Sequence, residues 1–425
     1  MGTDFLAPDN TTFIVLSFEG PDVYARAGGL GVRVTELSLA LADAGYPVHL
    51  LFVGDPALPG HESHGQLTLH RWCQWISTYH PEGVYSGEDG KWRDFSSSTV
   101  DFVIDELIRP AARENHRVVI LSEEWHTAEA LCRIGDRLWE TGLRRHAVLL
   151  WNANNTMGFN RIDWRRLNFA TTITTVSRYM KHIMWTFGVD PLVIPNGIPT
   201  RWLDAPPDES ADDVRHQLGD GPILVKVARF DPDKRWKLAL ETVAQLKTAD
   251  RPARLVARGG MEAHGGEVFD HARALGLSVR DVSVKKPGVH HLAEALGAAD
   301  HADILNVTSF IAPEDLRVLY RAADGVLANS GREPFGLVGL EAMAAGGTAF
   351  TGNTGEEYAR HLENAVVLDT ADPAEAAWYV AYLADRPGEQ ARLRTEARAT
   401  ARRFTWDRVL DQLLARVRVL AAAQN

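Results

Sequence analysis

Short apolar runs alternate with helical patterns from near the beginning of this chain. The β-branched and aromatic run TFIVLSF at 12–18 is followed by a helical pattern at 34–44 and a strand-like run at 47–53. The alternation continues with strand-like runs at 118–121, 147–151 and 170–176 and with a helical pattern from Thr127. Parallel strands need long crossover connections, which helices supply, so this order predicts a parallel sheet covered by helices.

A second series of the same kind follows a turn-rich, acidic stretch at 194–211. Its segments are a strand at 222–228, a helix at 236–249, a strand at 253–257, a helix at 268–275 and a strand at 325–328. With 425 residues, the chain also exceeds the size at which one hydrophobic core stops growing. We therefore predict an α/β fold of two Rossmann-like, doubly wound parallel-sheet domains that face each other across a cleft, at 1–197 and 198–405.

Residues 57–100 interrupt the alternation and carry aromatic side chains among glycine and serine. These are Trp72, Trp75, Tyr79, Tyr85 and Trp92. The composition predicts a long functional loop or an irregular insertion, and the pattern at 278–303 is equally irregular. The rings at 72–92 could stack on a saccharide, although single aromatic residues more often belong to a core.

Charge and cysteine content narrow the class of protein. The net charge of -11, from 56 acidic and 45 basic residues, gives no overall attraction for nucleic acid or an anionic membrane. The densest basic stretch, 392–403, reads as a solvated helix face. Cys73 and Cys132 are too few for a disulfide framework and predict buried thiols in a reducing compartment. Without a leader pattern or a long apolar run, we expect a cytoplasmic protein with no stable membrane insertion.

The segment VARFDPDK at 227–234 suits the binding of a diphosphate. Arg229 and Lys234 follow a predicted strand and precede a predicted helix. Arginine offers a planar fork and lysine a mobile point charge, so together they can neutralise a diphosphate as a leaving group. The alternative is a solvated pair that caps a loop. We expect Asp231 and Asp233 to be turn residues and not metal ligands.

The segment SGREPFGLVGLEAMAAGG at 330–347 places Glu333 and Glu341 eight positions apart. Pro334 fits the first turn of a helix, whose N-terminal amides attract phosphate. Eight residues of helix rise roughly 12 Å, which is comparable to the span of a sugar diphosphate. Because each carboxylate accepts two hydrogen bonds, one could meet the sugar and the other the ribose.

On these residues the chain resembles the glycogen-synthase-like and sucrose-synthase-like group of retaining GT-B glycosyltransferases, the glycosyl transferases group 1. The resemblance implies that Arg229 and Lys234 bind the donor diphosphate, that Glu333 contacts the transferred sugar and that Glu341 contacts the ribose. It implies further donor contacts at Pro334, Phe335, Gly336 and Leu337, and base recognition by backbone groups near Thr308.

In the first half of the chain, the resemblance rests on a glycine-rich segment and a histidine. Gly28, Gly29, Leu30 and Gly31 are similar to the family's glycine-rich loop near the phosphates and the acceptor. EEWHT at 123–127 is similar to the family's cleft segment and makes His126 a sugar contact, although an isolated histidine at a strand end is more often structural. FTWDRV at 404–409 resembles the final helix, so a helix at about 406–425 would pack back on the first domain. Ala25, Arg26 and Ala27 stand where glycogen synthases often carry a lysine, which weakens the assignment of a glucan acceptor.

The resemblance implies transfer of a hexosyl unit, with glucosyl favoured, from a nucleoside diphosphate sugar to a hydroxyl of a saccharide or small molecule, with retention of configuration. UDP-glucose and ADP-glucose are the leading donors. No tightly bound cofactor and no metal are expected, because Arg229, Lys234 and helix amides would stabilise the leaving group. A GT-B-fold phosphorylase or epimerase and a non-catalytic sugar-nucleotide sensor are the alternatives. The sequence leaves open the donor base, the acceptor and the oligomeric state.

Overall fold

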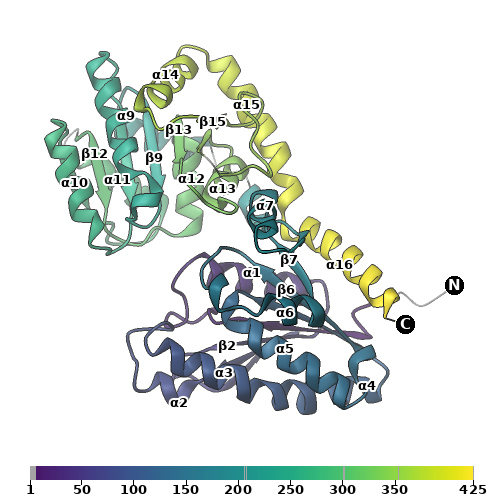
Figure 1. Cartoon of the computed structure of the whole chain (residues 1–425). Helices are drawn as coiled ribbons and strands as arrows, with labels where there is room; N and C mark the ends of the chain where they lie inside the picture. The colour runs from purple at the N-terminus through teal and green to yellow at the C-terminus, as the bar shows by residue number, and fades with distance from the viewer. Residues whose placement is uncertain (1–5, 205, 207, 300–301, 353, 425) are drawn as a thin grey trace. The chain divides into compact units, whose positions relative to one another are not determined.

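The computed structural model describes residues 6–204, 206, 208–299, 302–352 and 354–424. They form two compact units, Met1–Pro199 with Thr405–Asn425 and Thr200–Phe404 (Figure 1). The chain passes from the first unit to the second after Pro199, against a predicted division after residue 197, and it returns to the first unit at Thr405.

The first unit is built on an eight-stranded sheet with the order β3-β4-β2-β1-β5-β6-β7-β8. The strands are β1 (Thr11–Leu16), β2 (Val48–Val53), β3 (His61–His64), β4 (Leu67–Trp72), β5 (Arg117–Glu123), β6 (Ala147–Ala153), β7 (Thr172–Thr175) and β8 (Leu192–Val193). Only β3 pairs with its neighbour in the antiparallel sense among the described strands. Every residue of β6 is buried, as expected for a parallel strand covered on both faces.

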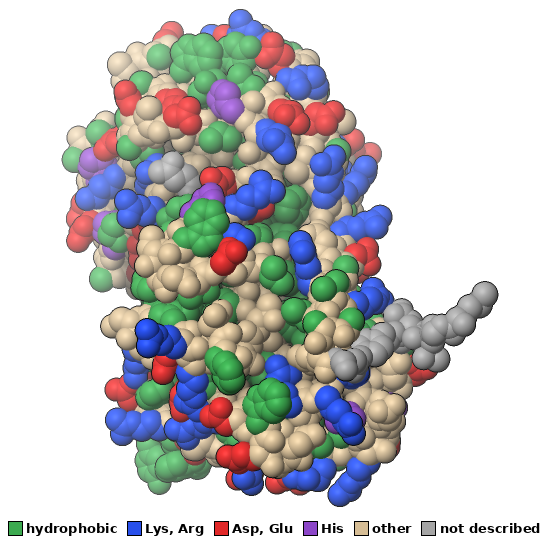
Figure 2. Space-filling view, turned by 45° about the vertical axis from the view of Figure 1, so that its right-hand side comes forward, with side chains coloured by type: hydrophobic (Ala, Val, Ile, Leu, Met, Phe, Trp, Pro, Cys, Tyr) green, Lys and Arg blue, Asp and Glu red, His purple; other side chains and the backbone are tan. Residues whose placement is uncertain are grey.

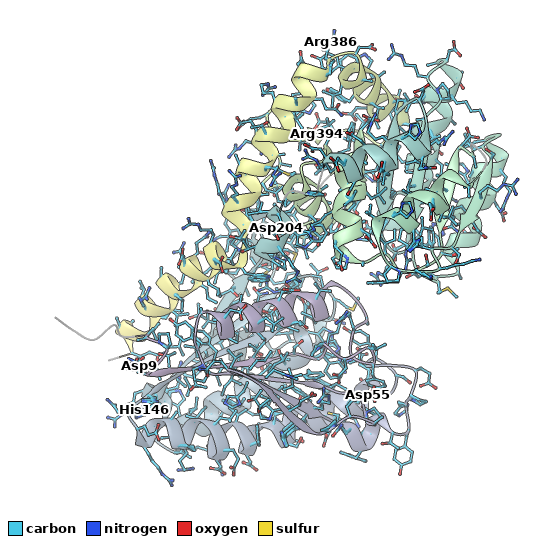
Figure 3. All side chains as sticks on the ribbon, turned by 180° about the vertical axis from the view of Figure 1, so that it is seen from behind. Asp9, Asp55, His146, Asp204, Arg386 and Arg394 are labelled. Carbon is cyan, nitrogen blue, oxygen red and sulfur yellow. The ribbon has the colours of Figure 1, made fainter. Side chains whose placement is uncertain are left out.

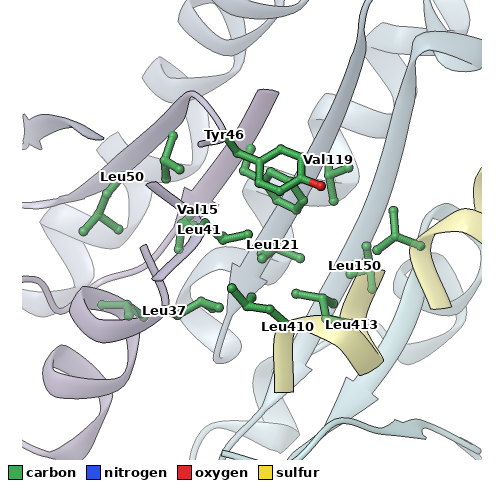
Figure 4. Close-up of a cluster of buried hydrophobic side chains, with 14 of the residues drawn as sticks. Val15, Leu37, Leu41, Tyr46, Leu50, Val119, Leu121, Leu150, Leu410 and Leu413 are labelled. Carbon is green, nitrogen blue, oxygen red and sulfur yellow. The ribbon is translucent and has the colours of Figure 1, made fainter. Parts of the chain in front are cut away.

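Helices connect these strands. They are α1 (Gly29–Asp43), α2 (Gln74–Ser77), α3 (Glu88–Phe102), α4 (Arg109–Arg113), α5 (Trp125–Glu140), α6 (Trp164–Ala170), α7 (Arg178–Trp185) and α16 (Trp406–Ala423), with a π-helical segment at Val103–Ile108 between α3 and α4. Leu410 and Leu413 of α16 lie in one apolar cluster with Leu37 of α1 and Leu150 of β6 (Figure 4). The last helix therefore contributes to the core of the first unit.

The second unit holds a seven-stranded parallel sheet with the order β11-β12-β10-β9-β13-β14-β15. Its strands are β9 (Ile223–Val227), β10 (Arg254–Arg258), β11 (Val279–Val282), β12 (Ile304–Val307), β13 (Gly325–Ala328), β14 (Ala349–Thr351) and β15 (Val366–Val367). Its helices are α8 (Asp208–Leu218), α9 (Trp236–Thr248), α10 (His264–Ala274), α11 (Val289–Gly297), α12 (Pro313–Ala322), α13 (Leu337–Ala345), α14 (Pro373–Ala384) and α15 (Pro387–Ala401).

The expectation of a loop or irregular insertion at 57–100 is wrong. This segment contains β3, β4, α2 and most of α3. Its aromatic side chains pack locally, which is why periodicity did not reveal the elements: the Phe102 ring lies 5.1 Å from both Trp72 and His70, and Phe95 is fully buried. Trp75 and Tyr79 stay largely exposed. The irregular stretch at 278–303 likewise holds β11 and α11.

The basic stretch at 392–403 is only partly the solvated face that the sequence suggested. Arg394 of α15 donates to the carbonyl of Ala323 at 2.6 Å and to Thr348 Oγ1 at 3.1 Å (Figure 3). Arg398 donates to the carbonyl of Leu203 at 2.5 Å. These two arginines tie α15 to the rest of the second unit. Elsewhere, acidic and basic side chains intermingle on the face shown in Figure 2.

Candidate functional site

Two loops meet at the carboxyl edge of the second unit's sheet. They are the β9–α9 loop (228–235) and the β13–α13 loop (329–336), and they are adjacent because β9 pairs with β13. Gly331 N donates to Asp233 O at 2.7 Å, and Arg332 N donates to Asp233 Oδ1 at 3.1 Å. Ligands of open parallel sheets bind at this edge. The structure therefore brings the two predicted donor segments together.

An ion pair joins the two loops. Lys234 Nζ lies 3.3 Å from Glu333 Oε1, with the two side chains 17% and 31% exposed. Such partial exposure leaves both groups accessible to a ligand. Arg229 is exposed, and its carbonyl accepts a hydrogen bond from the indole of Trp236 at 2.8 Å. The same loop supplies another cation, Arg235, which the sequence analysis did not select because it stands outside the predicted pair.

The prediction that Pro334 opens a helix is wrong. The helix α13 begins at Leu337, after Gly336, whose φ of 81° lies in the left-handed region that glycine tolerates. Glu333 therefore lies in the loop and Glu341 in α13, so a helical rise does not separate them. The Phe335 side chain is buried against Tyr358 and belongs to the core. Tyr358 donates to the carbonyl of Gly336, which fixes the turn before α13.

Glu341 lies near two buried tyrosines of the second unit. Burial raises the pKa of Tyr320 well above its usual value, and the Glu341 carboxylate raises it further. The pKa of Tyr358 is also raised, first by burial and then by the Glu333 and Glu341 carboxylates. Both phenols therefore stay protonated. They can face the two carboxylates without adding negative charge to the site.

A buried lysine lies beneath the Lys234–Glu333 pair. Lys226 of β9 donates to the carbonyl of Leu327 at 3.1 Å and to Asn329 Oδ1. Its Nζ also lies 5.4 Å from the centre of the Trp236 ring. Burial lowers the pKa of Lys226 to about 7, against an opposing effect of Glu333 and with the help of Lys234 and Arg235. The sequence analysis missed this group because a lysine inside a strand pattern carries no sign of its burial.

The depressed pKa of Lys226 predicts a pH-dependent stability. Between about pH 7 and 10.5 the unfolded chain holds a proton on this lysine that the folded chain lacks. The free energy of unfolding should therefore rise with pH in this window, by up to about 1.4 kcal/mol per pH unit. Urea unfolding of wild type and Lys226→Met at about pH 6, 7.5 and 9 measures the difference. A difference that does not change with pH would contradict the prediction.

A cavity of about 330 Å³ lies beside the β12–α12 loop, near Thr308. Lys285, Lys286, Ser309, Phe310 and Asp315 are among its lining residues. The amide of Thr308 already donates to the carbonyl of Val282 at 2.9 Å, so this amide is engaged within the sheet edge. The volume is in the range of small-molecule sites.

The glycine-rich segment of the first unit is not a free loop. Gly28 is the N-cap of α1, and Gly29, Leu30 and Gly31 form its first turn. The amides of Gly28 and Gly31 donate to Glu19 Oε2 at 2.9 and 3.0 Å. Helix N-termini attract anions, and the protein's own carboxylate occupies this one.

His126 lies at the start of α5 and is 2% exposed. Its Nε2 lies 2.8 Å from Glu88 Oε1, and its ring stacks on Phe18 at 4.2 Å and on Trp125 at 3.8 Å. Burial lowers the pKa of His126 to about 4 despite the opposing effect of Glu88, so the imidazole is neutral at physiological pH. Its Nδ1 is buried without a hydrogen-bond partner among the described residues.

Glu124, which the sequence analysis did not select, precedes His126 in a strained conformation. Its φ of 67° is unusual for a side chain with a Cβ, and such strain gathers at functional sites. Burial raises the pKa of Glu124 to about 8. One carboxyl oxygen accepts from Asn154 N at 2.7 Å, and the other is buried without a partner in the described structure. Glu124 and His126 follow β5, which pairs with β1 at the point where the strand order of the sheet reverses.

Two further observations concern the described residues as a whole. They contain no group of three or more His, Cys, Asp or Glu side chains placed to hold a metal ion. In the same parts of the chain, every helix is too short or too polar to cross a membrane.

Comparisons with known proteins identify the family. Residues 208–400 match the family described as glycosyl transferases group 1. The D-inositol 3-phosphate glycosyltransferase of Geodermatophilus obscurus is 32% identical over 242 residues, which cover 54% of this chain and 48% of that protein. The namesake of Salinispora tropica is 38% identical over 201 residues, or 46% of this chain and 37% of that protein. The matched segments thus span about half the length of these relatives, or less.

Solved structures of other proteins superimpose on nearly the whole chain. Sucrose-phosphate synthase from Thermosynechococcus elongatus has a TM-score of 0.67 at 19% identity and covers 97% of this chain and 100% of its own. HepE of Anabaena in complex with UDP-glucose has a TM-score of 0.63 at 14% identity, with 96% and 99% covered. These likenesses confirm the predicted fold class. The second unit therefore belongs to the glycosyl transferases group 1 family, and the whole chain has the GT-B fold.

Proposed function

We propose that this chain is a retaining glycosyltransferase that moves a hexosyl unit from a nucleoside diphosphate sugar to a hydroxyl of a saccharide or small molecule. Among hexosyl units, glucosyl is favoured. The observation that carries this proposal is the Lys234–Glu333 ion pair at the carboxyl edge of the family-matched unit. A partly exposed, flexible cation beside a carboxylate suits a substrate with a diphosphate next to a sugar.

The roles follow from the chemistry of each group. Lys234, Arg229 and Arg235 bind the diphosphate and stabilise the charge that grows as the bond from C1 to the phosphate oxygen breaks. Glu333 accepts hydrogen bonds from sugar hydroxyls, and Glu341 accepts them from the ribose. The acceptor oxygen forms the new bond to C1 on the face that the phosphate leaves, and a phosphate oxygen takes its proton.

The cavity near Thr308 is our candidate for the base. Its volume of about 330 Å³ and the exposed ring of Phe310 suit a flat heterocycle. We place uridine first among the bases, because a related fold, HepE, has been solved with UDP-glucose. Adenine and guanine are the alternative bases, and the donor experiment below compares all three.

Thermal unfolding with UDP-, ADP- and GDP-sugars tests the donor site. One donor should stabilise the wild type, by about 2.7 kcal/mol at a concentration 100 times its Kd. The Glu341→Ala variant should lose this stabilisation, since it removes the ribose contact. The matched control is Glu396→Ala, which removes the same charge from an exposed position on α15 and should respond like wild type. Absence of a shift with every donor would contradict the proposed function.

A further inference from the structure

Lys226 joins the two strands from which the β9–α9 and β13–α13 loops leave; we call these two loops the donor loops. It is the penultimate residue of β9, and its side chain is 1% exposed. The amine reaches the neighbouring strand, where it donates to the carbonyl of Leu327 at 3.1 Å and to Asn329 Oδ1. Asn329 is itself buried and is the first residue of the β13–α13 loop. Lys226 therefore fixes the start of the loop that carries Glu333.

The same amine lies against the base of the β9–α9 loop. Its Nζ is 5.4 Å from the centre of the Trp236 ring, a distance at which a cation is attracted to the ring face. Trp236, which begins α9, is buried, and its indole donates to the carbonyl of Arg229 at 2.8 Å. This hydrogen bond closes the loop that carries Lys234. Lys226 thus contacts the framework of both donor loops, which meet at the Lys234–Glu333 pair.

These contacts of the Lys226 amine are all neutral: a carbonyl, an amide oxygen and an aromatic ring. In the part of the chain that the structure describes, no carboxylate forms an ion pair with this amine, and the Glu333 carboxylate is paired with Lys234. Burial lowers the pKa of Lys226 to about 7; Glu333 opposes this effect, and the positive charges of Lys234 and Arg235 add to it. Near neutral pH the amine and the ammonium are therefore both populated. A negative charge that comes close favours the ammonium.

We infer that Lys226 is a positioning residue of the donor site, which holds the two donor loops together and takes up a proton from solvent when the diphosphate of a nucleotide sugar binds beside Lys234. This inference rests on the proposed transferase function and adds a regulation of the same site by pH. The diphosphate brings negative charge to the donor loops, and the amine beneath them becomes an ammonium. The donor and the proton therefore bind cooperatively.

The sign of the pH effect follows from the two protonation states. Well below pH 7 the lysine already holds its proton in the free protein, so donor binding takes up none. At higher pH the free protein has to gain the proton as the donor binds, and the affinity for the donor falls. An opposite charge close to a group shifts its pKa by about 1 or more, which corresponds to a Kd that rises about 10-fold between about pH 6 and pH 9.

Isothermal titration calorimetry of the full chain with UDP-, ADP- and GDP-glucose tests the inference. The diphosphate of these donors has no group that titrates near neutral pH, so a proton that is taken up on binding goes to the protein. Titrations at about pH 7.5 in two buffers of different ionisation enthalpy give the number of protons. If the pKa starts at about 7 and rises by about 1, wild type should take up about 0.5 proton per donor bound.

Two variants assign the proton to Lys226. Lys226→Met removes the amine, so the proton uptake and the pH dependence of Kd should both vanish. Asn329→Asp keeps the amine and places a carboxylate beside it, which holds the ammonium form throughout the range of the titrations. The uptake should vanish here too, although the lysine is present, and a purely structural role of Lys226 does not produce this result. The matched control is Lys237→Met, which removes an exposed lysine on α9 and should behave like wild type.

The outcomes distinguish a failure of this inference from a failure of the proposed function. Proton uptake that persists in a folded Lys226→Met protein would assign the proton to another group and overturn the inference. Asn329→Asp decides in the same way if the methionine variant does not fold or binds the donor too weakly to measure. A donor that binds wild type without proton uptake would also overturn the inference, while the proposed function stands. If none of the three donors binds, the proposed function fails and this inference fails with it.

Discussion

Replacing Lys234 with alanine is expected to lower kcat/KM for glycosyl transfer by at least about 100-fold, the usual cost of losing one charge-stabilising donor. Lys234 Nζ is held 3.3 Å from Glu333 Oε1, at the junction of the two loops to which we assign the donor diphosphate and sugar. The substitution removes a positive charge from the diphosphate in the transition state, and it also frees Glu333 from the partner that orients it. Steady-state kinetics with the donor identified by thermal unfolding measure the loss.

The matched control is Lys237→Ala. Lys237 is an exposed lysine on α9, three positions along the chain, so its removal changes the net charge equally without touching the loop junction. Both variants should keep the wild-type Tm to within a few degrees, because a partly exposed ion pair contributes only about 0–1 kcal/mol. A Lys234→Ala enzyme within a few-fold of wild type would remove the diphosphate role from this lysine.

Arg33→Met is expected to lower the free energy of unfolding by about 3–5 kcal/mol, the cost of leaving a buried charge without its partner. The guanidinium pairs with Glu123 while the two side chains are only 6% and 1% exposed. Asn152 and Asn154 also donate to Glu123, at 2.9 and 2.7 Å, but these neutral amides cannot replace a positive charge. Arg33 Cζ also lies 5.7 Å from the centre of the Trp406 ring, so the variant weakens the packing of α16 on the first unit.

A double-mutant cycle and a surface pair complete the test. Arg33→Met with Glu123→Gln should be more stable than Arg33→Met alone, because no buried charge is left unpaired. Arg109→Met breaks an exposed pair with Asp105 and should cost about 0–1 kcal/mol. Urea unfolding followed by circular dichroism gives the free energies of unfolding of the wild type, Arg33→Met, Glu123→Gln, the double variant and Arg109→Met. Equal costs at Arg33 and Arg109 would show that burial does not set the energy of the Arg33 pair.

The fold class follows from the sequence, because the alternation of strand and helix patterns admits few architectures. β13 spans the predicted residues 325–328, and α9 begins at the predicted Trp236. The sequence also shows which functional groups are available. A cation pair, Arg229 and Lys234, suits a diphosphate, and a carboxylate pair, Glu333 and Glu341, suits hydroxyls.

Which side chains lie together, and which of them are charged, depends on contacts between segments that are far apart in the chain. Pro334 is a typical first residue of a helix, yet α13 starts at Leu337 because Gly336 adopts a left-handed turn that Tyr358 fixes from a distant segment. Glu19 is nine and twelve positions from Gly28 and Gly31, whose amides donate to it, and Asn154, which follows the neighbouring strand β6, donates its amide to Glu124. The pKa values of Lys226, Glu124 and His126 shift because burial removes water from charged groups, and a linear pattern of residues does not record burial.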